Sequence, residues 1–167
     1  MNKCIFLDRD GVINRDYPDY VYTLDRFEIL PGVIEAITRI KEAGFLAIVV
    51  TNQSGISKGI YTRFQMQECH DYMQQELGHQ IDRIYYAPWH PDQSESLSRK
   101  PSTLMFERAI ARYDIDVSQS WMIGDKERDL IPAQKLGIKT IQVGGREDQL
   151  ATFVEKDLLS AIARIIP

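Results

Sequence analysis

Two aspartates near the N-terminus have the spacing that acid–base and nucleophilic chemistry requires. Asp8 and Asp10 follow a short apolar segment, residues 3–7, and precede Gly11. In an extended backbone, residues two apart project from the same face, so both carboxylates point the same way. Two close carboxylates repel each other unless they share a cation. One can then act as a nucleophile while the other moves protons, which is the division of roles in a phosphoryl-enzyme mechanism.

Other polar groups along the chain suit a phosphate and a metal ion. Thr51 and Asn52 follow a second apolar segment, and their side chains, with the backbone N–H groups of the turn that follows, can hold phosphate oxygens. Lys100 offers a positive charge to a transferring phosphoryl group. Asp125 and Asp129 lie four apart around a predicted strand-to-helix turn, and carboxylates are ligands that Mg²⁺ prefers. Each feature also has an ordinary structural explanation, so the interpretation depends on their combination.

Short apolar segments alternate with helical patterns along the chain. Apolar segments ended by polar residues predict buried strands at 3–7, 45–50, 83–87, 121–123 and 140–143. Apolar spacing near 3.6 residues, with Thr62 as an N-cap and glycines after the helix ends, predicts helices at 34–43, 63–77, 102–113, 129–136 and 158–166. The alternation predicts an α/β fold with a five-stranded, mostly parallel sheet and helices on both faces. Because such sheets bind ligands at the carboxyl ends of their strands, the polar residues should meet there.

Length, composition and charge narrow the class of protein. The 167 residues predict a single domain, 1–167, and contain no apolar run of the roughly 18–20 residues that a membrane-spanning helix needs. The net charge of −4 argues against binding to a nucleic-acid backbone. Cys4 and Cys69 are too few for a disulfide framework or a four-thiolate zinc site. We therefore expect a cytoplasmic monomer that binds neither a membrane nor nucleic acid.

The order of the motifs resembles that of the haloacid dehalogenase (HAD) superfamily. The matching stretches are Phe6-Leu-Asp-Arg-Asp-Gly-Val-Ile-Asn14, Val50-Thr-Asn-Gln-Ser-Gly-Ile56, Arg99-Lys-Pro101 and Met122-Ile-Gly-Asp-Lys126. Within it, the chain is most similar to the D-glycero-D-manno-heptose 1,7-bisphosphate phosphatases and the related histidinol-phosphate phosphatases. The resemblance implies a three-layer, Rossmann-like core and an Mg²⁺-dependent phosphatase that hydrolyses a small sugar phosphomonoester through an aspartyl-phosphate. The favoured substrate is the heptose 1,7-bisphosphate, cleaved at the 7-position to heptose 1-phosphate.

The same resemblance implies roles for individual residues in the reaction. Asp8 is the nucleophile, and Asp10 protonates the leaving group and then activates water. Thr51 and Lys100 hold the phosphoryl oxygens. The Asp8 side chain, the Asp10 backbone carbonyl and Asp125 bind Mg²⁺.

Further matching positions surround these groups. Asp129 is expected to orient the water ligands of the metal or Lys126. Contacts with the substrate are implied for Asn52, Gln53, Ser54, Arg99 and Lys126. A sugar bisphosphate has a second anionic group, which Arg99 or another cation near the mouth of the site, Lys58, Arg63 or Lys126, could bind by charge-assisted hydrogen bonds.

Two features of related proteins are missing from this sequence. Relatives often hold a structural zinc in the loop before Arg99 through Cys-Xaa-His and Cys-Xaa-Cys pairs. Residues 87–98 contain no cysteine, and His90 is the one histidine there, so we expect no structural zinc. The segments 11–34 and 52–83 are too short for an inserted cap domain, which needs a core of about 40 residues. We therefore expect an open site without a large cap domain, whose specificity comes from surface loops.

Two alternatives share parts of the pattern. A receiver-like phospho-acceptor domain, which is not an enzyme, also has acidic residues and a lysine at the ends of parallel strands. Such a domain places its acceptor aspartate after the third strand, whereas Asp8 ends the first strand and Asp10 follows it, which favours turnover over a stored phosphate. A histidinol-phosphate phosphatase, or a phosphatase for another small metabolite, would use the same catalytic groups and differ only in its substrate.

Overall fold

A single parallel sheet organises the chain. The computed structural model describes residues 1–144 and 150–167, and its six strands have the order β3-β2-β1-β4-β5-β6. The strands are β1 (Cys4–Leu7), β2 (Leu46–Asn52), β3 (Arg83–Ala87), β4 (Trp121–Gly124), β5 (Lys139–Val143) and β6 (Phe153–Glu155). Every adjacent pair is parallel. The five predicted strands are present, and the α/β prediction is confirmed.

The sixth strand corrects the predicted count of five. β6 has three residues and pairs with β5 at the edge of the sheet, from Ile141 opposite Phe153 to Val143 opposite Glu155. Phe153 and Val154 are partly exposed, at 38% and 37%. A three-residue edge strand of this kind has no apolar run long enough to be recognised in the sequence, because its backbone pairing rather than its burial defines it.

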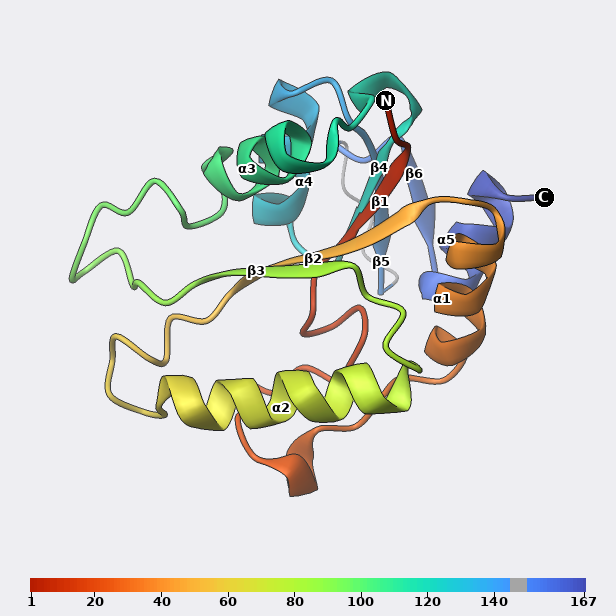
Figure 1. Ribbon diagram of the computed structural model, residues 1–167. Helices are drawn as coiled ribbons and strands as arrows, with labels where there is room; N and C mark the ends of the chain where they lie inside the picture. The colour runs from red at the N-terminus through yellow and green to blue at the C-terminus, as the bar shows by residue number, and fades with distance from the viewer. Residues whose placement is uncertain (145–149) are drawn as a thin grey trace.

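Helices cover both faces of the sheet, as predicted (Figure 1). They are α1 (Val33–Glu42), α2 (Arg63–Glu76), α3 (Leu104–Tyr113), α4 (Glu127–Lys135) and α5 (Leu158–Ile165), with short 3₁₀ turns at Leu24–Arg26 and Val117–Gln119. Buried residues of α1, α2 and α5 pack in one apolar cluster, and those of α3 and α4 pack in a second one. The sheet therefore separates two apolar cores, which makes the molecule three-layered.

The ends of α2 and α4 can be compared with the boundaries predicted from the sequence. Thr62 caps α2 as predicted, since its hydroxyl accepts a hydrogen bond from the backbone N–H of Gln65 at 3.2 Å. α4 begins two residues earlier than predicted. The backbone N–H of Lys126 donates to Asp129 Oδ2 at 3.1 Å, so Asp129 caps the helix from its first turn.

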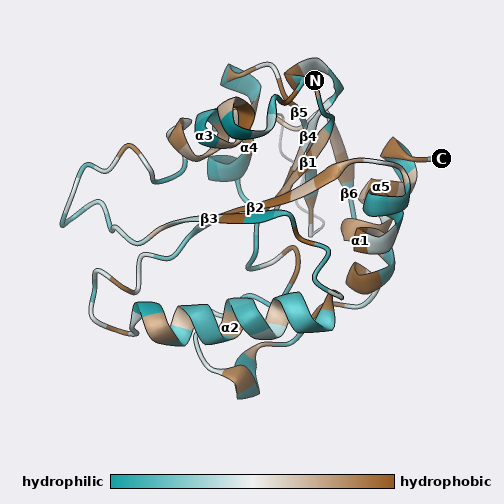
Figure 2. Ribbon diagram, viewed as in Figure 1, coloured by the Kyte–Doolittle hydropathy of each residue, from teal (hydrophilic) through white to brown (hydrophobic). Residues whose placement is uncertain are grey.

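The central strand fixes the start of the candidate site. All four residues of β1 are fully buried; Ile5 and Leu7 face one apolar cluster, and Cys4 and Phe6 face the other. Figure 2 shows the continuous apolar colouring of the central strands between two layers of mixed helices. Burial on both faces requires an uninterrupted apolar segment, so the first polar residue, Asp8, marks the carboxyl end of the strand.

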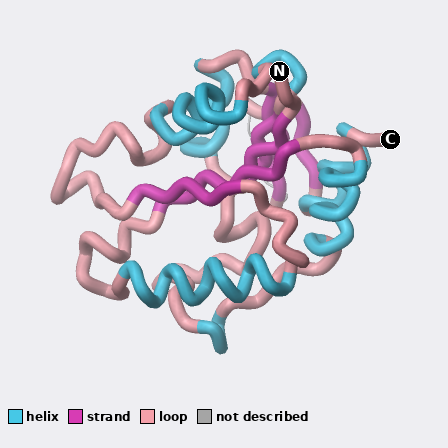
Figure 3. The backbone as a smooth tube through the Cα atoms, in the orientation of Figure 1, coloured by secondary structure: helices cyan, strands magenta, loops and turns pink. Residues whose placement is uncertain are grey.

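Parallel pairing brings several strand ends together. Leu7 lies opposite Val49 of β2 and Ile123 of β4, so the residues that follow these positions occupy the same edge of the sheet. Figure 3 shows long loops after β2 and β3 leaving the sheet on the same side. No helix among the described residues is long and apolar enough to cross a membrane.

Candidate active site

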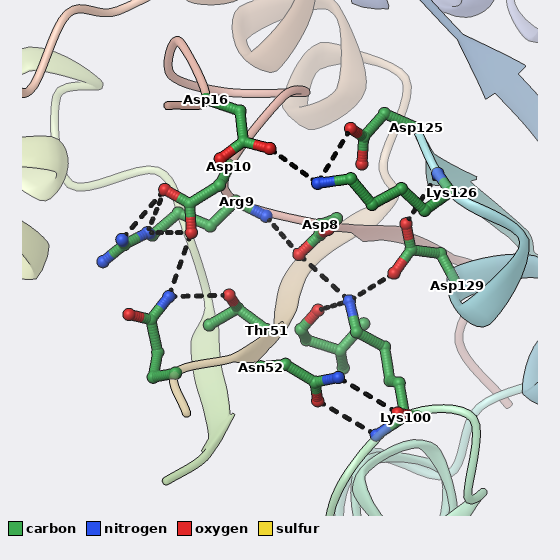
Figure 4. Close-up of polar contacts among 12 residues, drawn as sticks. Asp8, Arg9, Asp10, Asp16, Thr51, Asn52, Lys100, Asp125, Lys126 and Asp129 are labelled. Carbon is green, nitrogen blue, oxygen red and sulfur yellow. Dashed lines mark hydrogen bonds and ion pairs between the residues drawn. The ribbon is translucent and has the colours of Figure 1, made fainter. Parts of the chain in front are cut away.

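A buried lysine joins Asp8, which follows β1, to Asp129 in the first turn of α4. The Nζ atom of Lys100 lies 3.0 Å from Asp8 Oδ1 and 2.7 Å from Asp129 Oδ1, and it donates a hydrogen bond to the Val50 carbonyl at 2.7 Å (Figure 4). All three charged residues are at most 3% exposed. A buried ammonium needs this many partners, because an unpaired charge is costly in a protein interior. The contacts therefore fix a positive charge directly beside Asp8.

Asn52 holds the backbone that carries this lysine. Its side-chain Nδ2 donates to the Lys100 carbonyl, and its Oδ1 accepts from the Lys100 N–H, both at 3.0 Å. The amide thus ties the end of β2 to a segment 48 residues further along the chain. Asn52 also lines the cavity over the site, where the sequence predicted a substrate contact. In this structure, both polar atoms of its side chain bind the Lys100 backbone and so position that lysine.

Asp10 has a set of partners quite different from that of Asp8. Arg9 reaches it through Nη2 at 2.9 Å and Nε at 3.2 Å, Asn14 donates at 2.9 Å, and Gln53 donates at 3.1 Å. Burial by itself would raise the pKa of Asp10, but the charge of Arg9 and these hydrogen bonds outweigh it and lower the pKa. Asp10 is therefore held as a carboxylate at the edge of the site.

The turn after β2 supplies the remaining predicted polar groups. Thr51 is 1% exposed, and its hydroxyl accepts a hydrogen bond from Gln53 Nε2 at 2.9 Å. Gln53 and Ser54 are buried and line the same cavity as Asp8. The structure thus brings the predicted phosphate-binding turn to the predicted nucleophile, although the amide of Gln53 is already occupied by protein groups.

The carboxylate of Asp125 packs directly against the backbone of Gly11. Gly11 has φ +87°, and a Cβ atom at that position would lie 2.5 Å from Asp125 Oδ2. Only glycine both adopts this backbone conformation and leaves room for the carboxylate. Lys126, on the other side, lies 3.5 Å from Asp125 Oδ2 and donates to Asp16 at 2.6 Å. The expected substrate ligand Lys126 is therefore held between two carboxylates.

The carboxylates of Asp8, Asp125 and Asp129 form the group that fits a divalent cation. Each offers one oxygen, and these oxygens lie within 4.8 Å of one another. Asp125 Oδ1 is buried without a hydrogen-bond partner among the described residues. Burial, and next the charge of Asp129, raise the pKa of Asp8 to about 7 and that of Asp125 to about 6. The hard oxygen donors of Asp8 and Asp125, with the added negative charge of Asp129, suit Mg²⁺, which keeps several water ligands. Both oxygens of Asp129 are already engaged by Lys100 and the Lys126 N–H.

An open cavity of about 300 Å³ lies over these groups. Its wall includes Asp8, Asp10, Asp16, Asn52, Gln53, Ser54, Arg99, Lys126 and Arg128. Arg99 and Arg128 form no ion pair with a carboxylate in residues 1–144 and 150–167, and Arg128 Nε is buried without a hydrogen-bond partner there. Partial burial and then the charge of Arg128 lower the pKa of Arg99. Two cations without carboxylate partners leave this part of the cavity suited to an anion.

Three charged residues of the site were not predicted from the sequence. Arg9 lies between the two aspartates, and in an extended backbone its side chain would leave the opposite face, yet its guanidinium donates to Asp10 at 2.9 Å. Asp16 and Arg128 stand in segments with no recognisable spacing, so only their contacts assign them to the site. The one sequence feature that indicates a role for Arg9 is the adjacent Asp10, because an arginine that becomes buried needs an acid within reach.

Comparisons with known proteins agree with this geometry. The HAD-hydrolase-like family model matches residues 97–158. A D-glycero-beta-D-manno-heptose-1,7-bisphosphate 7-phosphatase of Haemophilus ducreyi is 40% identical over 147 residues, which are 83% of this chain and 80% of that protein. The chain belongs to the heptose-bisphosphate phosphatase family of HAD-like hydrolases. It is therefore a phosphoric monoester hydrolase.

Other members of the family differ in the anomer that they act on. A D-glycero-alpha-D-manno-heptose-1,7-bisphosphate 7-phosphatase of Burkholderia mallei is 38% identical over 148 residues, covering 83% of this phosphatase and 78% of the relative. A solved D,D-heptose 1,7-bisphosphate phosphatase from B. bronchiseptica, complexed with magnesium and phosphate, has a TM-score of 0.90 and 30% identity and covers 98% of both chains. The phosphatase thus shares its whole architecture with a magnesium-binding relative.

Proposed function

We propose that this phosphatase removes the 7-phosphate of D-glycero-D-manno-heptose 1,7-bisphosphate to give heptose 1-phosphate. The observation that carries the proposal is the pairing of Lys100 with Asp8, which lines a cavity together with Asp10 and two arginines that have no carboxylate partner among the described residues. The sugar is supported by relatives about 40% identical over four-fifths of the chain that are named for this substrate. The two anomers named among the relatives are both candidate substrates.

In the first step, an Asp8 carboxylate oxygen attacks the phosphorus of the 7-phosphate, and the bond from phosphorus to the sugar oxygen breaks. Asp10 gives its proton to that oxygen. The incoming anionic phosphate raises the pKa of a neighbouring carboxylate, which favours the protonated form of Asp10 that the step needs. Lys100 and Thr51 bind the phosphoryl oxygens, and their fixed positions reduce reorganisation in the transition state.

In the second step, Asp10 takes a proton from water, and the water oxygen attacks the phosphorus of the aspartyl-phosphate. The bond to Asp8 breaks, so the carboxylate is regenerated and inorganic phosphate leaves. Side chains of Asp8 and Asp125 and the backbone carbonyl of Asp10 would hold Mg²⁺. When bound, the ion neutralises charge on the phosphoryl oxygens.

Asp129 has a supporting role in this proposal. Its Oδ1 pairs with Lys100 at 2.7 Å, and its Oδ2 accepts from the N–H of Lys126 at 3.1 Å. It thereby keeps the ammonium beside Asp8 and orients the loop that carries Asp125.

The substrate experiment compares phosphate release from four phosphomonoesters, with and without Mg²⁺. These are both anomers of the heptose 1,7-bisphosphate, histidinol phosphate and a monophosphorylated heptose. We expect one heptose bisphosphate anomer to have the highest kcat/KM, and Asp8→Asn protein to release no phosphate above background. A higher kcat/KM for histidinol phosphate would overturn the assignment of the sugar while leaving the phosphatase chemistry intact.

We propose further that Arg99 and Arg128 bind the phosphate at the 1-position. Both line the cavity and have no carboxylate partner in the described part of the chain. Arg99→Ala and Arg128→Ala should each raise the KM for the bisphosphate roughly tenfold, since a charge-assisted hydrogen bond contributes about that factor. The KM for the heptose 7-monophosphate should stay nearly unchanged. An equal rise for both substrates would contradict a second-phosphate site.

A further inference from the structure

The side chain of Gln53 is enclosed in the protein, and all its polar atoms are engaged. Gln53 is 1% exposed. Its Nε2 donates to Asp10 Oδ2 at 3.1 Å and to Thr51 Oγ1 at 2.9 Å, and its Oε1 accepts from the Tyr61 hydroxyl at 2.6 Å. Both N–H donors of the amide are therefore engaged, and they are directed at two residues proposed to act on the phosphate.

The direction of this amide matters for the reaction. Its two N–H bonds face the proton-transfer group Asp10 and the phosphate ligand Thr51. If the amide were reversed, its oxygen would face Asp10 and would repel the carboxylate. The oxygen would also accept the proton of the protonated carboxyl and compete with the leaving group for it. Only the N–H direction leaves the Asp10 proton available to the substrate.

The hydroxyl of Tyr61 holds the Gln53 amide oxygen on the side away from Asp10 and Thr51. Its hydroxyl makes the shortest contact of the network, and a buried amide oxygen without a donor would be destabilising. Burial raises the pKa of Tyr61 far above its usual value, so the phenol remains a hydrogen-bond donor. Without this hydroxyl, the buried oxygen would gain a donor by turning toward the Thr51 hydroxyl, which would also bring it toward Asp10.

The ring of Tyr61 is fixed by groups outside the catalytic cluster. Tyr61 is 3% exposed and stacks on Tyr22, with ring centroids 5.0 Å apart and planes 8° apart. A Cβ atom on Gly55 would lie 2.1 Å from the Tyr61 ring, so the glycine makes room for the aromatic side chain. The hydroxyl therefore has a defined position relative to the turn after β2.

We infer that Tyr61 is a positioning residue that acts through Gln53, holding the amide so that its N–H groups face Asp10 and Thr51. The inference rests on the proposed role of Asp10 as the proton donor to the leaving group. Tyr61 does not itself line the cavity and makes no hydrogen bond with Asp10 among the described residues; its one hydrogen bond to the catalytic cluster there is to the Gln53 amide, through which we expect it to act.

Tyr61→Phe removes the hydroxyl and keeps the stacked ring. For a heptose phosphate, whose alkoxide leaving group needs protonation, kcat/KM should fall roughly tenfold while KM stays within about twofold. For p-nitrophenyl phosphate, whose leaving group needs little protonation, kcat/KM should fall less than about twofold. The matched control is Tyr22→Phe, which removes a hydroxyl from the ring stacked on Tyr61 and should leave both values unchanged.

A double substitution tests whether Tyr61 acts through the amide. Gln53→Leu should lower kcat/KM for the heptose phosphate at least as much as Tyr61→Phe, and the double variant should be no worse than Gln53→Leu. Circular dichroism and thermal unfolding establish that each variant is folded. Additive losses, equal losses on both substrates, or full activity of folded Tyr61→Phe would overturn the inference. Failure of the wild-type protein with Mg²⁺ to hydrolyse either phosphomonoester would instead overturn the proposed function.

Discussion

Asp8 and Asp10 are the same residue type two positions apart, yet their surroundings shift their pKa values in opposite directions. Burial and the nearby Asp129 raise the pKa of Asp8 to about 7, whereas Arg9 and neutral donors outweigh burial at Asp10 and lower its pKa. The carboxylates around Asp8 therefore carry more negative charge than Lys100 compensates, whereas Arg9 compensates the charge of Asp10. This contrast separates the cation-binding nucleophile from the proton-transfer group.

Asp8→Asn should reduce kcat by roughly a thousandfold or more, because the amide cannot form the aspartyl-phosphate. The melting temperature without Mg²⁺ should not fall, since Lys100 keeps its partner Asp129 and one buried negative charge is removed. Phosphate-release assays and thermal unfolding measure the two quantities. Activity within tenfold of wild type would exclude Asp8 as the nucleophile.

His70, a buried histidine that the proposed reaction does not use, gives the protein a pH-dependent stability. It is 2% exposed on α2, and burial lowers its pKa to about 3. The unfolded chain, with a histidine pKa of about 6.5, binds a proton that the folded protein does not, so stability falls as the pH drops from about 6.5 toward 3. The slope from this group should approach 1.4 kcal/mol per pH unit at about pH 5.

Urea unfolding at several pH values between about 7 and 4 measures this contribution. The free energy of unfolding of His70→Gln should rise relative to wild type as the pH falls. The control His79→Asn changes an exposed histidine and should follow wild type. Parallel curves for wild type and His70→Gln would mean that His70 takes up its proton in the folded state.

At the scale of elements, the site depends on how closely the turn after β1 approaches the turn after β4. Gly11 and Asp125 lie at the carboxyl ends of these paired strands. Gly124 allows a second close approach, because a Cβ atom there would lie 2.4 Å from the Asp129 Cβ. The two glycines let carboxylates from α4 and its preceding loop enter the space beside Asp8.

Gly11→Ala should disrupt this approach. The added methyl would lie 2.5 Å from Asp125 Oδ2 at φ +87°, so the carboxylate must move. We expect kcat/KM to fall by roughly a hundredfold or more and the Mg²⁺-induced rise in melting temperature to shrink. Gly44→Ala is the matched control: its φ is +74°, nothing lies within 4 Å, and it should lose about 1 kcal/mol of stability but no activity. Equal activities of the two variants would contradict the close-approach argument.

At the scale of the whole molecule, metal binding should stabilise the fold. Added Mg²⁺ should raise the melting temperature in a saturable manner, because the ion binds the folded state and relieves repulsion among Asp8, Asp125 and Asp129. EDTA should abolish activity, and Mg²⁺ should restore it. Full activity after exhaustive chelation would overturn the magnesium requirement.

Elemental analysis of the purified protein tests the zinc prediction separately. We expect well under one zinc per chain, because residues 87–98 provide one histidine and no cysteine. Within the described structure, His90 Nδ1 lies 3.2 Å from Asp92. One tightly held zinc per chain would show that other residues complete a site in this loop.

The sequence alone determined the α/β architecture and the edge where the site lies. Apolar segments buried on both faces must end where polar residues begin, and parallel strands carry those ends to one side, so Asp8, Thr51 and Asp125 had to gather. The three-residue β6 could not be predicted in this way, because a strand that pairs at the edge of a sheet needs no apolar run.

Only the tertiary structure decided what each polar side chain does within that site. Asn52 engages Lys100 from 48 residues away, and Gln53 binds Asp10 from 43 residues away, so their amides serve the catalytic groups first. Spacing along a chain fixes which face a side chain leaves, but a hydrogen bond depends on angstrom-scale distances between segments that are remote in sequence. The roles of Arg9, Tyr61 and Arg128 therefore became visible only when the strands, turns and loops were packed together.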